Sequence, residues 1–254
     1  MHMDADRVRN YFERLDVVCD YARAVEGVGL WESEKKVFCE HIGRDSEILE
    51  LGCGAGRIAH GLFRLGYGRI TATDFSSNMI DVARAVACEF GDSVDYRVED
   101  ARNLSFPDGS FDAAIFGFNG LMQIPGRSQR RRAVSEVCRV LRGGGIFIFT
   151  THDRDLPSNS AYWERERALW ERGGRNPDLD EFGDRVYGDG FGGNIYIHSP
   201  VLSDVEADLR AAGFGAIFRA RRSEIAAEPA RVREFSDDCV FWVAEKMHNM
   251  HIIG

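Results

Sequence analysis

The sequence is poor in lysine and contains no long apolar run. Lysine occurs only at positions 35, 36 and 246, and the formal net charge is −9. A broad nucleic-acid interface needs a basic face, so no DNA partner is expected, although a small RNA acceptor is compatible with this charge. No run of eighteen apolar residues occurs and the first residues, MHMDAD, do not resemble a signal peptide. We therefore expect a cytoplasmic protein without a membrane span.

The cysteines lack the spacing of a metal or disulfide framework. Six are present, but none belongs to a C-x-x-C pair, and their neighbours are mostly apolar. Metal sites and disulfide frameworks need clustered spacings. We predict reduced, mostly buried thiols and no metal site.

A glycine-rich stretch organises the rest of the chain. Residues 48–51 (ILEL) form a short apolar run that predicts a buried strand. Residues 52–56 (GCGAG) follow, and an apolar periodicity from residue 58 predicts a helix. A helix that begins behind such a turn offers free N–H groups to an anion. The dinucleotide pattern G-x-G-x-x-G fails here, because its last position is Arg57.

Instead, the stretch E-L-G-C-G-A-G-R resembles the first motif of class I S-adenosylmethionine-dependent methyltransferases. Four further motifs follow in the family's order. They are Asp74 after a strand at 69–73, Asp100-Ala101 after a strand at 94–98, the phrase LSFPDGSFD before a strand at 112–116, and VLRGGGIFIFT with a strand at 146–150. The resemblance covers residues 45–150 and implies S-adenosyl-L-methionine as the cofactor.

The resemblance also assigns roles to individual residues. Asp74 would accept hydrogen bonds from the ribose hydroxyls, Asp100 and the backbone of Ala101 would meet the adenine, and Met79 either packs on the adenine or belongs to the ordinary core. The complete set of predicted cofactor-binding residues is Glu50, Gly52, Cys53, Gly54, Gly56, Asp74, Phe75, Met79, Asp100, Ala101, Phe116 and Gly117.

The element order predicts a single α/β domain with a doubly wound, Rossmann-like sheet. Strands at 214–220 and 239–244 would complete seven, the last one antiparallel. Residues 1–42 would form a helical lid, beginning with one amphipathic helix over 4–25. Residues 43–152 would form the cofactor-binding half, 153–200 an acceptor-pocket insertion containing a strand at 194–198, and 201–246 the rest of the sheet. The tail 248–254 is expected to be loose.

Four residues are candidates for work on the methyl acceptor. Asn119 and His152 follow two predicted strands whose carboxyl ends meet at the ligand crevice, and His152 is either a general base or a positioning group. His198 shares a strand face with Tyr196. Tyr11 is a candidate because the family's N-terminal helices often lend a tyrosine, although both Tyr11 and Tyr21 are also compatible with simple packing.

These features favour methyl transfer to a small molecule, achieved mainly by proximity and orientation. The acceptor cavity should be walled by residues near Tyr11 and by the 153–198 insertion. Alternatives are a methyltransferase acting on RNA or protein and a non-catalytic S-adenosylmethionine-binding module. An NAD(P)-dependent oxidoreductase is disfavoured, because no tyrosine is followed four residues later by lysine.

Overall fold

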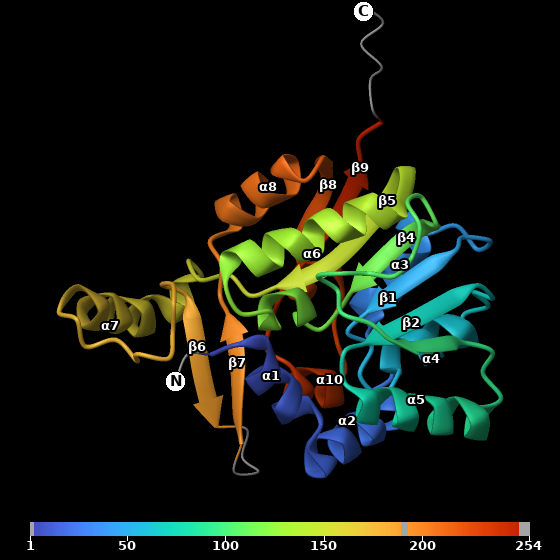
Figure 1. Cartoon of the computed structure of the whole chain (residues 1–254), viewed down its shortest axis with the longest axis horizontal. Coiled ribbons are helices and arrows are strands. Elements are labelled where there is room, and N and C mark those ends of the chain that lie inside the picture. Colours follow the sequence, from blue (N-terminus) through green and yellow to red (C-terminus); the bar gives the residue numbers. More distant parts are fainter. Residues whose placement is uncertain (1–2, 189–192, 249–254) are drawn as a thin grey trace, which may run out of the picture.

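The computed structural model describes residues 3–188 and 193–248 and contains a seven-stranded sheet in the order β3-β2-β1-β4-β5-β9-β8 (Figure 1). Only β9 runs antiparallel to its two neighbours. This confirms the predicted doubly wound sheet. The strands are β1 Ile48–Leu51, β2 Ile70–Asp74, β3 Asp95–Val98, β4 Phe111–Phe116, β5 Leu141–Thr151, β8 Phe214–Arg221 and β9 Val240–Lys246.

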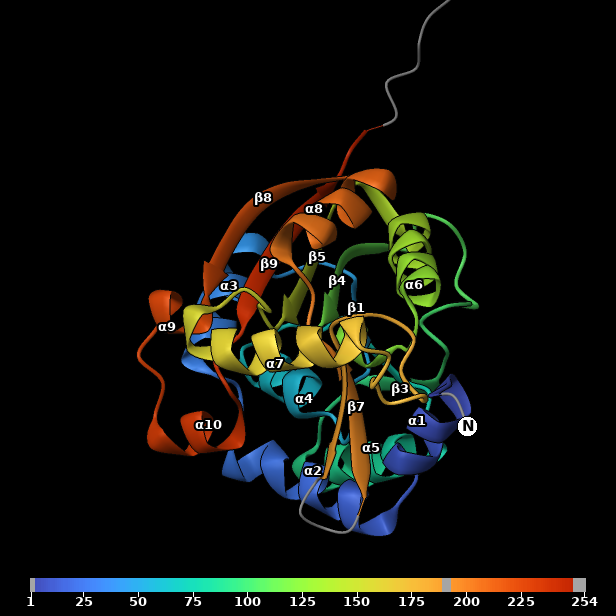
Figure 2. The ribbon, with the colours of Figure 1, turned by 90° about the vertical axis from the view of Figure 1, so that its left-hand side faces the viewer.

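Helices cover both faces of the sheet, as expected for parallel strands buried on both sides. One apolar core contains side chains of α3, α4 and α5, and the other contains side chains of α6 and α8. Figures 1 and 2 show these two layers. The helices are α3 Glu32–His41, α4 Arg57–Arg64, α5 Ser77–Phe90, α6 Arg127–Val140 and α8 Leu202–Ala211.

The predicted single helix over residues 4–25 is wrong, because two helices, α1 Ala5–Phe12 and α2 Leu15–Gly27, occupy this segment. The chain turns at Arg14, whose ψ of 133° is extended. The carboxylate of Glu13 accepts hydrogen bonds from the backbone N–H groups of Ser77 and Asn78 at the start of α5. The break therefore lets Glu13 bind the unsatisfied N-terminus of another helix, a tertiary contact that periodicity does not reveal.

The insertion after β5 forms a small unit of its own. It contains η2 Pro157–Asn159, α7 Ser160–Glu171 and a hairpin of β6 Asp184–Gly188 with β7 Asn194–His198. The predicted strand at 194–198 is confirmed as β7, whereas its partner β6 was not predicted. In Figure 1, α7 projects at the left beyond the hairpin.

Three short helices complete the fold. The helix η1 Gly120–Gln123 follows β4, and the helices α9 Arg222–Ile225 and α10 Ala230–Phe235 lie between β8 and β9 in the sequence. The strand predicted at 146–150 is longer in the structure, because β5 already begins at Leu141, which pairs with Phe111. None of the helices in the described ranges combines the length and apolar content needed to cross a bilayer. The predicted loose tail from residue 249 onward lies outside the described residues.

Candidate active site

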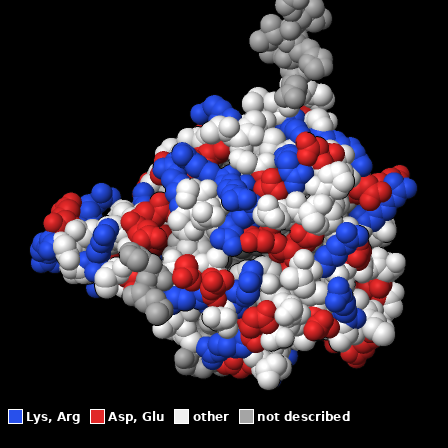
Figure 3. Space-filling model, viewed as in Figure 1, with Lys and Arg blue, Asp and Glu red and all other residues white. Residues whose placement is uncertain are grey.

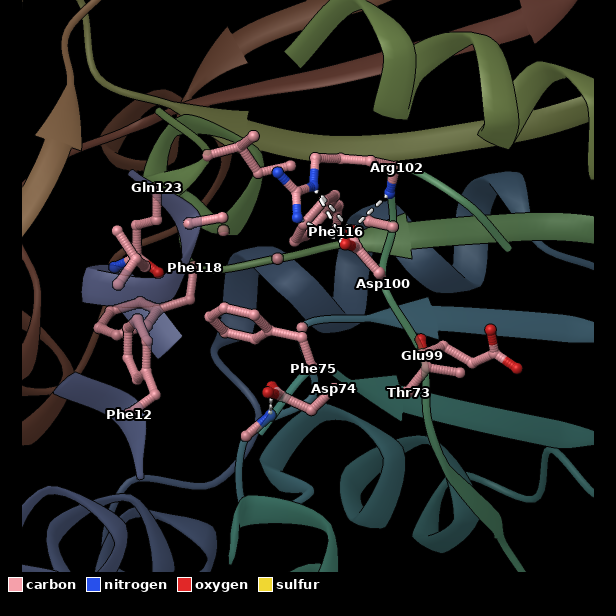
Figure 4. Close-up of a pocket in the computed structure, with 18 of the residues that line it drawn as sticks. Phe12, Thr73, Asp74, Phe75, Glu99, Asp100, Arg102, Phe116, Phe118 and Gln123 are labelled. Atoms are coloured by element: carbon pink, nitrogen blue, oxygen red, sulfur yellow. Dashed lines mark hydrogen bonds and ion pairs between the residues drawn. The ribbon is translucent and has the colours of Figure 1, made fainter. Parts of the chain in front are cut away.

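A cavity lies at the carboxyl ends of β1, β2 and β4, with α1 and α2 on its opposite wall (Figure 4). Eight of the predicted cofactor-binding residues line it, namely Gly52, Gly54, Asp74, Phe75, Asp100, Ala101, Phe116 and Gly117. These residues are far apart in the sequence. They meet because parallel strands end at one edge, which is where doubly wound sheets bind ligands.

The glycine loop allows close contacts that a side chain would block. Gly54 has a φ of +54°, and a Cβ built on it would lie 2.9 Å from Cδ1 of Tyr21. Gly56 has a φ of +91°, and its Cβ would lie 2.6 Å from the Tyr96 hydroxyl. Glycine alone adopts this backbone without cost and leaves this space. Gly56 does not line the cavity. Its role is structural: it allows the turn before α4 and the close approach of the Tyr96 hydroxyl.

Asp74 holds the loop and the next helix with one carboxylate. Its Oδ2 accepts from the backbone N–H of Gly54 at 2.9 Å, and its Oδ1 accepts from that of Ser76 at 2.9 Å. Burial raises the pKa of Asp74 to about 6, although these two hydrogen bonds favour the ionised form. Each oxygen keeps further lone-pair capacity for a ligand.

Asp100 is paired with an arginine that the sequence did not identify as part of the site. Arg102 Nη2 donates to Asp100 Oδ2 at 2.6 Å and its Nε donates to Oδ1 at 2.9 Å (Figure 4). Burial alone would raise the pKa of Asp100, but the hydrogen bonds with Arg102 outweigh it and lower the pKa. The carboxylate is thus ionised and held in a fixed orientation at the rim of the cavity.

Glu50 lines an adjoining recess with Gly52, Cys53 and Gly117. It is buried, and its Oε2 has no hydrogen-bond partner among the residues that the structure describes. Burial raises its pKa to about 8, although Arg57 favours the charged form. An unpartnered buried carboxyl oxygen is costly, so this position is matched to a ligand that brings a donor or a positive charge.

The N-terminal lid contributes apolar and aromatic side chains. Val8 and Phe12 of α1 and Tyr21 of α2 line the cavity. The candidate Tyr11 does not. It lies in a separate recess with Asn194 and Tyr196, where its ring meets Phe12 edge-on at a centroid distance of 5.0 Å. The choice of Tyr11 over Tyr21 is therefore a correction.

Met79 also lies outside the cavity. It is fully buried in an apolar cluster with Phe12, Val17 and Val18, and this cluster joins α5 to the lid helices. Since α1 and α2 cover this face of α5, the structure favours the ordinary-core alternative for Met79.

Asn119 and His152 lie together just beyond β4 and β5. Asn119 Nδ2 is 3.4 Å from His152 Nε2, and the Asn119 backbone N–H donates to Thr150 Oγ1 at 2.8 Å. Asn119 and the preceding Phe118 both have positive φ, 58° and 48°. Such backbone strain in residues other than glycine clusters at functional sites. The Oδ1 of Asn119 is buried and has no hydrogen-bond partner in the described part of the chain.

His152 is a neutral imidazole at pH 7. Burial lowers its pKa, and the nearby Asp237 opposes this only in part. If Asn119 Nδ2 donates to Nε2, then Nε2 carries the lone pair. The contact joins two residues that were predicted to face the ligand crevice, although neither is among the residues that line the cavity.

His198 lies elsewhere, and this corrects the expected cavity. It shares a strand face with Tyr196, as predicted, but both side chains bind Asp184: Tyr196 donates to Oδ1 at 2.6 Å and His198 Nδ1 lies 2.8 Å from the same atom. His198 faces a second cavity beside α6 and α8. No described residue of 153–198 lines the cofactor cavity, because the hairpin packs this face on α1 and η1.

The remaining wall of the cofactor cavity comes from residues that the sequence analysis missed. Ala5 of α1 and the segment at the end of η1, Gln123, Ile124 and Pro125, line it. The apolar face of α1 was visible in the sequence, but a packing face and a ligand face have the same periodicity.

Comparison with known proteins agrees with this geometry. Residues 48–145 match the family model described as "Methyltransferase domain". The fold is that of an S-adenosylmethionine-dependent methyltransferase from Methanosarcina mazei, with a TM-score of 0.67, 22% identity, and coverage of 86% of this chain and 99% of the other. Residues 48–145 thus form a methyltransferase domain, and the fold is that of the class I S-adenosylmethionine-dependent methyltransferases.

Two curated methyltransferases share its sequence over part of their length. A demethylmenaquinone methyltransferase of Symbiobacterium thermophilum is 29% identical over 56% of this chain and 57% of its own. A ubiquinone biosynthesis O-methyltransferase of Methylocella silvestris is 37% identical over 44% of this chain and 41% of its own. The chain thus spans about half the length of the curated relatives that it matches.

S-adenosyl-L-methionine is the cofactor of this family, and the described residues fit it. The unpartnered oxygen of Glu50 matches an ammonium group, and Asp74 has capacity for two hydroxyls. The glycine loop leaves room for a closely approaching ligand. When bound, the cofactor supplies an activated methyl group on a cationic sulfur.

Proposed function

We propose that the protein transfers the methyl group of S-adenosylmethionine to a small molecule by in-line displacement. The observation that carries the proposal is the meeting of Glu50, Asp74 and Asp100 beside one cavity that α1 and α2 cover. The sulfonium is already activated, so the protein must chiefly hold donor and nucleophile in line. Orientation of this kind supplies roughly 7–11 kcal/mol of the barrier reduction.

The acceptor would approach from the side of Phe118, Asn119 and His152. Phe118 stacks on Phe235 of α10 at a centroid distance of 4.9 Å and meets Tyr21 edge-on at 6.2 Å. These rings offer an apolar surface for a planar acceptor. The lone pair on His152 Nε2 can take the acceptor's proton when the acceptor displaces the Asn119 Nδ2 group from it. The Oδ1 of Asn119 can accept a hydrogen bond from a second donor on the acceptor.

Charge and resemblance favour a small acceptor over a nucleic acid. Figure 3 shows acidic and basic side chains interspersed over the face above α6 and the lid, with no continuous basic tract across it. The matched relatives carry the names of demethylmenaquinone and ubiquinone-biosynthesis methyltransferases. We infer an aromatic, hydroxyl-bearing acceptor for this chain.

His152→Ala is expected to slow methyl transfer by about 10²–10⁴-fold, the usual contribution of a general base. The measurement is methyl transfer from labelled S-adenosylmethionine to a panel of phenols and hydroxybenzoates. The loss should shrink at high pH, where the acceptor ionises without help. Affinity for S-adenosylhomocysteine should change less than twofold.

His41→Ala, a substitution on α3, is the matched control and should leave the rate unchanged. Full turnover by His152→Ala on an acceptor that the wild type methylates would remove His152 from the chemistry. Binding of S-adenosylhomocysteine without turnover on any acceptor would instead favour a binding module.

A further inference from the structure

A second cavity lies between α6, α8, η1 and the β6-β7 hairpin, apart from the cofactor cavity. Its volume is about 210 Å³. Leu121, Met122 and Phe149 form apolar parts of its wall. Its cationic lining consists of Arg127, Arg130, Arg131 and Arg154.

Three of these arginines have carboxylate partners. Arg127 and Arg131 both bind Asp208, at 3.0 and 2.8 Å. Arg130 is buried and forms an ion pair with Glu181. Their charges are therefore compensated within the wall itself.

Arg154 is different. Among the described residues, no carboxylate lies within ion-pair distance of it. Its Nη1 donates to the Phe182 carbonyl at 2.6 Å, while its Nε is buried and has no acceptor within residues 3–188 and 193–248. Burial lowers the pKa of its guanidinium and outweighs the opposing effect of the Asp155 and Asp204 carboxylates, neither of which forms an ion pair with it. One positive charge in this wall is left for a ligand.

The neighbouring groups indicate whether the ligand is a cation or an anion. Glu181, Asp184 and His198 place three potential metal ligands within 4.8 Å of one another. Arg130 donates to this Glu181, and Asp184 accepts from Tyr196 and from two backbone N–H groups. A metal ion would have to displace these donors and lie beside a buried guanidinium, so the cavity suits an anion.

We propose that this cavity binds a compact organic anion, a carboxylate or a phosphate monoester, through Arg154. A guanidinium donates in a planar fork that matches both groups, and the apolar wall receives the rest of the molecule. Arg154 follows His152 by two residues at the end of β5. The anion is thus either the charged end of the methyl acceptor or a separate ligand. The binding itself does not depend on methyl transfer.

The test is calorimetric titration of the full chain with benzoate, its neutral analogue benzamide, and inorganic phosphate. Benzoate and phosphate should bind in the millimolar range or tighter, and benzamide should not. Arg154→Gln should weaken both anions at least tenfold. Arg167→Gln is the matched control, because Arg154 and Arg167 lie equally over the Phe182 ring, each at 4.9 Å, but Arg167 does not line the cavity. It should bind within twofold of wild type.

Arg154→Lys keeps the positive charge and should retain part of the affinity for the anions. This variant separates a loss of anion binding from a loss of the fold. Benzoate that competes with the methyl acceptor would identify the anion as the acceptor's own group, and benzoate that leaves turnover unchanged would identify a separate ligand. No anion binding up to about 50 mM, or equal affinities in Arg154→Gln and Arg167→Gln, would overturn the proposal.

Discussion

Asp74→Ala is expected to weaken S-adenosylhomocysteine binding by about 100-fold, or about 2.7 kcal/mol. Two effects combine. The carboxylate that faces the ribose hydroxyls is lost, and charge-assisted hydrogen bonds are the strong ones. In addition, the Gly54 N–H, which donates to Asp74 Oδ2 at 2.9 Å, loses its acceptor, so the glycine loop is no longer held. Isothermal titration calorimetry measures the change directly.

Asp81→Ala is the control for this variant, since Asp81 lies on α5, is largely exposed and forms only a 3.6 Å pair with Arg84. Its affinity should match wild type. An Asp74→Ala protein that binds with unchanged affinity would show that Asp74 does not hold the cofactor.

The second large effect concerns stability. Glu34→Ala is expected to lower the free energy of unfolding by about 3–5 kcal/mol, the usual cost of removing one partner of a buried ion pair. Glu34 binds Arg57 through two hydrogen bonds of 2.7 Å, and both side chains are buried. Glu34 Oε2 also accepts from the Trp31 backbone N–H at 2.8 Å. The substitution leaves the guanidinium behind the glycine loop without its counter-charge.

Urea denaturation of Glu34→Ala measures this loss, which should lower Tm by roughly 10 °C. Glu32→Ala removes a neighbouring but exposed pair with Lys35 and should cost less than about 1 kcal/mol. Replacing Glu34 and Arg57 together should restore part of the stability, because no buried charge is then left alone. Equal stability of the Glu34 and Glu32 variants would contradict the importance of this buried pair.

Local patterns were enough to predict the sheet and the core of the cofactor site. Glu50, Asp74 and Asp100 each lie at or just beyond the end of a strand, and the carboxyl ends of parallel strands meet at one edge whatever the details of packing. The glycines at 52–56 predicted the loop between β1 and α4, because glycine adopts its positive φ values without strain.

What the sequence could not predict depends on contacts between distant segments. The break between α1 and α2 allows Glu13 to accept a hydrogen bond from Ser77 at the start of α5, 64 residues later. Histidine is a common catalytic residue, but His198 binds Asp184 and its strand neighbour Tyr196 binds Arg130. These contacts place both side chains beside the second cavity. Tyr11 and Tyr21 differ in the direction in which their helices orient the side chain. That direction could not be predicted, because α1 and α2 were predicted as one helix. Periodicity gives the face of a helix but not its partner.

The central claim is tested most directly by calorimetric titration with S-adenosylhomocysteine and NAD at pH 6 and pH 8. S-adenosylhomocysteine should bind and NAD should not. Its affinity should rise with pH: Glu50, with a pKa raised to about 8 by burial, must lose its proton to pair with the ligand's ammonium group. The Glu50→Gln variant should bind more weakly and lose most of that dependence, keeping only the smaller part due to Asp74, whose pKa is about 6. Binding of NAD, or the absence of binding by S-adenosylhomocysteine at both pH values, would contradict the account.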